Sequence, residues 1–393
     1  MKHYIILIAL LLLAVSSFAQ TSFDKVLQSV EANNKELQAN TQLLTAQKLQ
    51  AKMDNNLPDP TVTYSHLFGN KEGLGFQGEF VASQSFDFPT VYKERSGLMK
   101  AKSVGWDRQY ASIRQQVLLQ AKEICLDLVL LNQQKELLEV RRHNAEQLAE
   151  LYDTRLAKGD ANILETNKIH LELLNVSTEV RMNETARTAK LKELATLNGG
   201  EAIEFTDTSY PLLEQPASFD ALRSEAMGAN VELLSLKSDQ LTAQRQIRVN
   251  KVMGLPELTL GYRMNPSTGG TRFNGFLVGV SIPLFSNRHN VKQAKAQSRY
   301  ADLKLESVSF SVENELETLY HQSLSLKSSM DEYEQVLKSQ NNLALLNKAI
   351  HAGQISMIEY FVDVTTYYQS VQNYMQLQNQ YQKVMAQLYK FRL

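Results

Sequence analysis

The polar residues best suited to chemistry lie in one stripe near the end of the 393-residue sequence. Successive spacings of three and four place them on one face of a helix. The stripe consists of Ser356, Glu359, Asp363, Thr366, Ser370 and Asn373. If copies of Glu359 and Asp363 met around an axis, their carboxylates would form a charged ring that attracts cations. The stripe could equally be an ordinary solvated face beside an apolar one.

A second acidic row consists of Glu165, Glu172 and Glu179. Its heptad spacing also places the three carboxylates on one side of a helix. This row is the alternative candidate for the lining of a water-filled space.

The sequence carries none of the common catalytic signatures. HExxH, GxSxG, a phosphate-binding loop and CxxC are all absent, and the seven histidines are scattered. Cys125 is the single cysteine, so an intramolecular disulfide is impossible. We therefore expect neither an enzyme nor a bound cofactor or metal.

The elements that position these residues come from a duplication. Leu57–Tyr64 reads LPDPTVTY and Leu255–Tyr262 reads LPELTLGY. After each come a glycine-rich turn, an alternating apolar run, a proline and a long helical pattern. The duplication divides the chain into a first repeat over residues 20–210 and a second over 211–393.

The first residues have the pattern of a secretory signal. Residues 1–19 hold a basic start, an apolar run and small residues at the end, although a membrane anchor has a similar pattern. Beyond residue 19 no apolar run is long enough for a membrane helix. The 41 Lys and Arg residues nearly balance 42 Asp and Glu residues, which gives no support for nucleic-acid binding.

Two strand pairs are expected, at about residues 61–88 and 258–282. Apolar residues alternate with small or polar ones along both pairs. This pattern fits strands with one face toward lipid, and equally a half-buried sheet in a soluble protein. The candidate lipid-facing residues are Tyr64, Tyr262, Phe276, Val278 and Val280.

Long helices follow each strand pair, at about residues 92–198 and 288–391. Ile113, Val117 and Ala121 begin an apolar seam with coiled-coil spacing, and a second seam starts at Leu119. A helix with two seams packs on two neighbours, which predicts a rod or a tube.

Four strands in one chain leave two open edges, which lipid does not tolerate. Strands placed in a membrane must therefore be shared among several chains. Two chains would give eight strands, and three would give twelve.

The duplicated plan resembles the TolC family of outer-membrane efflux channels. The resemblance covers the chain beyond residue 19 and includes Asn34-Lys35-Glu36-Leu37, the Leu57-Pro58 start of the strand pair, and Gly353 before Ile358-Glu359. Leu57–Pro60 and Ser85–Pro89 resemble its metal-efflux branch. The family implies a mainly α protein with a membrane β-barrel. It also implies a homotrimer with a twelve-strand barrel and a twelve-helix periplasmic tunnel.

The resemblance also implies a location and partners. It implies the outer membrane of a Gram-negative bacterium, with a large periplasmic part and contact with outer-membrane lipid. The partners would be a periplasmic adaptor and an inner-membrane transporter of the RND or ABC class.

Site residues follow from the same resemblance. Ser356, Glu359 and Asp363 would lie at the pore constriction. The helix tips would contact the adaptor through Lys158, Gly159, Asp160, Gly353, Gln354 and Ile355.

The competing hypothesis is a periplasmic coiled-coil scaffold or adaptor protein. A scaffold would need no glycine-rich turns between strands with one apolar face. An adaptor should have one helical hairpin flanked by β-rich modules, whereas this sequence has two equivalent halves.

Overall fold

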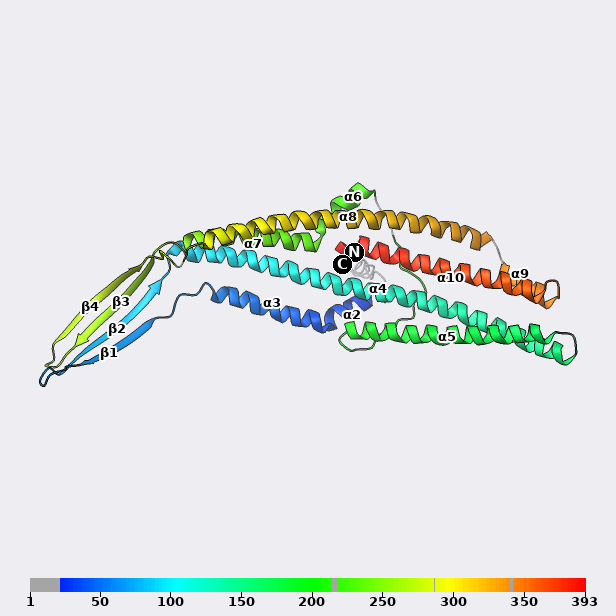
Figure 1. The fold of residues 1–393 in the computed structure, drawn as a ribbon, viewed down its shortest axis with the longest axis horizontal. Coiled ribbons are helices and arrows are strands. Elements are labelled where there is room, and N and C mark those ends of the chain that lie inside the picture. The colour runs from blue at the N-terminus through cyan, green and yellow to red at the C-terminus, as the bar shows by residue number, and fades with distance from the viewer. Residues whose placement is uncertain (1–21, 214–217, 286, 340–341) are drawn as a thin grey trace, which may run out of the picture. The chain divides into compact units, whose positions relative to one another are not determined.

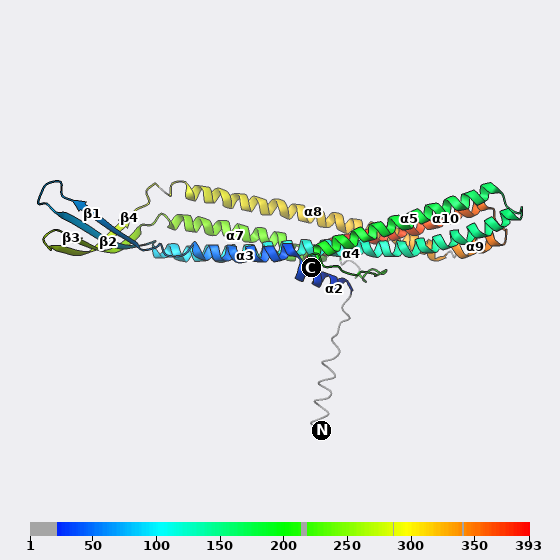
Figure 2. The ribbon, with the colours of Figure 1, turned by 90° about the horizontal axis from the view of Figure 1, so that it is seen from below.

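The computed structural model describes residues 22–213, 218–285, 287–339 and 342–393 (Figures 1 and 2). The predicted signal, residues 1–19, lies outside these ranges. Among the described residues, no helix has the length and hydropathy needed to cross a bilayer.

The same order of elements occurs twice: two helices, a strand pair and long helices. The first series is α2 (Ser22–Asn33), α3 (Lys35–Met53), β1 (Thr61–Phe68), β2 (Phe76–Phe86), α4 (Pro89–Ala157) and α5 (Ile163–Leu197). The second series is α6 (Phe219–Ala229), α7 (Val231–Val252), β3 (Glu257–Pro266), β4 (Arg272–Ser281), α8 (Asn290–Ser339), α9 (Asn342–His351) and α10 (Met357–Leu388), followed by the short 3₁₀ helix η1 (Lys390–Arg392).

The chain forms two compact units, and each takes segments from both series. The first unit holds the described part of Met1–Gln38 with Ile113–Gly228 and Glu313–Leu393, and the second holds Ala39–Ser112 and Ala229–Val312. The compact units do not coincide with the predicted repeats over 20–210 and 211–393. The repeat boundaries therefore remain a prediction from the sequence.

A recurring asparagine separates the two helices that begin each series. The Leu37 amide donates to Asn34 Oδ1 at 2.9 Å, and the Leu233 amide donates to Asn230 Oδ1 at 2.9 Å. An asparagine whose side-chain oxygen accepts a hydrogen bond from the backbone amide three residues later caps the start of a helix. This cap explains why α2 and α3 are two separate helices.

The first unit is held by buried apolar side chains from both series. One cluster joins Val30 of α2 to Ala121 and Leu126 of α4, and another joins Leu222 of α6 to Leu316 of α8 and Met385 of α10. Each fully buried valine, leucine or methionine side chain contributes about 1.5–3 kcal/mol. The predicted seam through Val117 and Ala121 is thus confirmed as a packing surface.

The second unit contains one antiparallel sheet with strand order β1-β2-β3-β4 (Figure 1). Leu258 pairs with Val280, Leu260 with Val278, and Tyr262 with Phe276. Paired residues share a face of a sheet. The two predicted strand pairs are confirmed, and within this chain they leave β1 and β4 as free edges.

Candidate functional site

The tip between α9 and α10 is closed by a glycine and a reciprocal cap. Gly353 has φ +69, a conformation that glycine adopts without strain. The Glu359 amide donates to Ser356 Oγ at 3.2 Å, and the Ser356 amide donates to Glu359 Oε2 at 2.8 Å. This capping box satisfies two amides that the start of α10 leaves without helical partners.

The tip between α4 and α5 repeats this arrangement. Gly159 has φ +78, and the Leu164 amide donates to Asn162 Oδ1 at 2.9 Å. The Asn162 amide donates to Glu165 Oε2 at 3.4 Å. Sequence analysis did not identify Asn162, although its spacing from Glu165 is that of a capping box.

Hydrogen bonds hold the pKa of Glu359 below its usual value. The donors are the backbone and the side chain of Ser356, and they favour the charged carboxylate. Glu359 is exposed and remains available to mobile ions.

Acid should loosen the first turn of α10. Because the pKa of Glu359 is lowered, the stability from this cap is complete above the usual carboxyl pKa and is lost as pH falls through the lowered value. Hydrogen exchange in this turn, corrected for intrinsic rates, should therefore speed up in acid. Glu359→Gln is the matched control, since glutamine keeps the cap without a titrating charge. The same acid response in both proteins would contradict this account.

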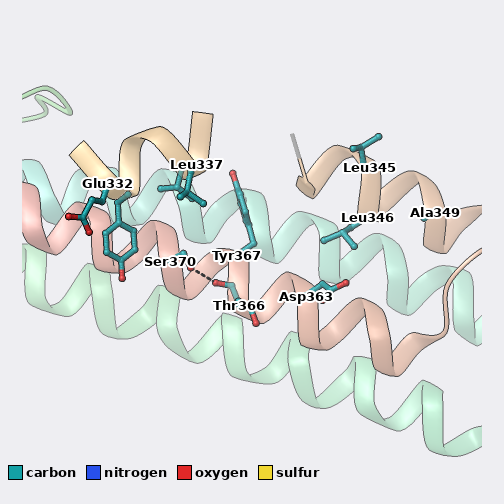
Figure 3. Close-up of a pocket in the computed structure, with 11 residues that line it drawn as sticks. Glu332, Leu337, Leu345, Leu346, Ala349, Asp363, Thr366, Tyr367 and Ser370 are labelled. Atoms are coloured by element: carbon teal, nitrogen blue, oxygen red, sulfur yellow. Dashed lines mark hydrogen bonds between the residues drawn. The ribbon is translucent and has the colours of Figure 1, made fainter. Parts of the chain in front are cut away.

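Asp363 lies one turn beyond Glu359 and lines a groove between α8, α9 and α10 (Figure 3). The groove has a volume of about 660 Å³. Thr366 and Ser370, from the same predicted stripe, also line it. The structure therefore separates the two carboxylates of the predicted constriction: Glu359 caps α10, and Asp363 contributes to a groove wall.

The alternative acidic row is tied to Arg141 of α4. Arg141 Nη2 lies 2.6 Å from Glu172 Oε1, and Arg141 Nη1 lies 3.0 Å from Glu179 Oε2. The guanidinium also stands 5.4 Å from the ring centroid of Tyr368 on α10. Within this row, Glu165 caps a helix while Glu172 and Glu179 neutralise an arginine. Sequence analysis missed Arg141 because its partners lie on another helix.

The five candidate lipid-facing residues share one face of the sheet. The pairing of Tyr64 with Phe80, and of Phe80 with Met264, places β1 in register with the apolar face of β3 and β4. All five side chains are exposed in this chain: Tyr64, Tyr262, Phe276, Val278 and Val280. The opposite face carries an ion pair between Arg263 and Glu79. One face is thus apolar and the other polar.

Residues 222–391 match the family described as outer membrane efflux protein. This part of the chain is an outer membrane efflux protein domain. For this part of the chain, the match agrees with the TolC-family prediction and with the outer-membrane location. The efflux-protein domain begins in α6 and ends within η1.

A relative of this chain is the alkaline protease secretion protein AprF of Pseudomonas aeruginosa. It is 25% identical over 291 residues, which are 68% of this chain and 59% of AprF. The chain therefore spans less than two thirds of that relative.

Solved structures share the fold. A membrane protein from Pseudomonas aeruginosa superimposes with a TM-score of 0.79 at 15% identity, covering 94% of this chain and 93% of the other. The outer membrane protein VceC of Vibrio cholerae has a TM-score of 0.76 at 12% identity, with 94% and 95% covered. These matches extend the shared fold well beyond residues 222–391.

Proposed function

We propose that this protein is the outer-membrane channel of a tripartite efflux system, a passive exit duct for small molecules or metal ions. The observation that supports it best is the four-stranded sheet, with one exposed apolar face and two free edges. Such edges need partners in lipid. Three copies would supply twelve strands for one barrel, so we propose a homotrimer.

The partners follow from the two tips. We propose that a periplasmic adaptor binds Lys158, Gly159 and Asp160 at one tip and Gly353, Gln354 and Ile355 at the other. An inner-membrane transporter of the RND or ABC class would supply energy. Both tips turn through a glycine with positive φ and start the next helix with a capping box, so they offer similar surfaces.

Protein export is the second candidate function. AprF is named for the secretion of an alkaline protease, and it shares 25% identity with this chain. A water-filled duct would serve either cargo, since the inner-membrane partner would select it.

Fractionation tests the channel proposal directly. The protein should appear in the outer-membrane fraction as an SDS-resistant trimer that dissociates on boiling. Recovery as a soluble periplasmic protein would favour the scaffold or adaptor hypothesis instead.

The tips should cross-link to the adaptor. Cysteine pairs placed across Gln354 and the adaptor, or across Asp160 and the adaptor, should form disulfides in the assembled pump. Replacing both tips with serine-rich loops should abolish efflux while the trimer persists. Normal efflux by that variant would remove the tips from the partner interface.

Glu359 and Asp363 should control cation selectivity. Charged rings at a narrow mouth favour cations, so Glu359→Gln with Asp363→Asn should lower selectivity and weaken block by multivalent cations. Assembly should be unaffected, because glutamine keeps the cap and both positions are exposed. Single-channel recordings in planar bilayers measure both properties. Unchanged selectivity and block would place these residues away from the conducting path.

A further inference from the structure

The groove between α8, α9 and α10 has the composition of a small-molecule site. Its volume, about 660 Å³, falls within the roughly 300–1,000 Å³ typical of such sites. Leu337, Leu345 and Leu346 supply apolar walls, and Tyr333 and Tyr367 supply aromatic rings. An apolar ligand body would therefore be covered on several sides.

The charge of the groove is of one sign. Glu332 and Asp363 are its charged lining residues, and neither forms an ion pair within the described part of the chain. Lysines near Glu332 on α8 are engaged elsewhere, since Lys327 pairs with Asp331 and Lys338 pairs with Glu334. Among the described residues, neither carboxylate is thus paired with a cation.

The Thr366 and Ser370 hydroxyls of the groove already have partners. Thr366 Oγ1 donates to the Val362 carbonyl at 2.8 Å, and Ser370 Oγ donates to the Thr366 carbonyl at 2.8 Å. Figure 3 shows Glu332 on the left of the groove and Asp363 on the right, with Leu337 and Tyr367 between them. The two carboxylates are therefore the strongest polar groups left for a ligand.

We propose that this groove binds an organic cation with an apolar body. The leucines would cover the body, the Tyr367 ring would attract the cation, and Glu332 or Asp363 would compensate its charge. Asp363 is shared with the proposed pore constriction, but binding in the groove requires neither transport nor a partner protein.

Tetraphenylphosphonium is the probe, measured by equilibrium dialysis against the purified full-length protein in lipid nanodiscs. One ion should bind per chain. Tetraphenylborate, of similar shape and opposite charge, should show only its partition into lipid. Glu332→Gln with Asp363→Asn should weaken tetraphenylphosphonium binding about tenfold, because both compensating charges are lost.

Two further variants test the position of the charge and the role of the apolar wall. Glu334→Gln removes a carboxylate from the same helix outside the groove, and binding should stay within about twofold. Leu345→Gln alters an apolar wall that is 63% exposed, and should weaken binding without affecting assembly.

The proposal fails if the wild-type protein retains no more cation than empty nanodiscs. It also fails if the double variant binds as tightly as Glu334→Gln.

Discussion

Arginine at Val278 or Val280 should largely prevent assembly in the outer membrane. These side chains are 70% and 62% exposed, and they lie opposite Leu260 and Leu258 on the apolar face. In the proposed barrel this face meets lipid, where arginine near the midplane costs about 2–4 kcal/mol. The amount of SDS-resistant trimer in outer-membrane fractions measures the loss.

The same strand provides matched controls. Leu277→Arg and Ser281→Arg insert the same side chain on the opposite face, which already carries the ion pair of Arg263 with Glu79. These variants should assemble much better than Val278→Arg and Val280→Arg. Equal losses in both pairs would show that the faces of the sheet are assigned the wrong way round.

Replacing Arg141 with methionine should destabilise the helical unit by about 2–4 kcal/mol. The Arg141 side chain is 13% exposed and that of Glu172 is 19% exposed, so methionine would leave a largely buried carboxylate without its cation. Methionine keeps the apolar stem, which limits the change to the charge. Thermal unfolding of the purified protein measures the effect.

A neighbouring residue and a double variant test the cause. Arg142 pairs with Glu139 and Glu146, whose side chains are all more exposed, so Arg142→Met should cost less than about 1 kcal/mol. Glu172→Gln should recover part of the loss in Arg141→Met, because the two residues are coupled. Equal effects of Arg141→Met and Arg142→Met would contradict a special role for this ion pair.

Local pattern predicted most of the fold. Alternating residues with glycine-rich turns placed strands at 61–88 and 258–282, and the structure has them at 61–86 and 257–281. The sequence also restricted the strand register, because Val278 and Val280 must share a face of the sheet with the apolar residues of the neighbouring strand. These features depend on neighbours in the sequence.

The candidate site was harder to predict from the sequence, because its geometry depends on contacts with other helices. Glu172 and Glu179 have the spacing of a lining, yet Arg141, from a helix that precedes them, holds both. Glu359 and Asp363 share a stripe, but one closes a helix end and the other lines a groove. Helical spacing predicts which residues share a face of one helix. It does not predict which residues of other helices contact that face.

The shared sheet and core have a consequence for the order in which the protein is made. Phe80 of β2 pairs with Met264 of β3, and Ala386 of α10 packs in the cluster that holds Val30 and Leu126. When only the first repeat has been synthesised, the β2 edge therefore has no β3 partner and the core lacks the side chains of α10. Such surfaces invite aggregation during export. If the chain is exported as its predicted signal implies, the first repeat must stay unaggregated until the second has followed it.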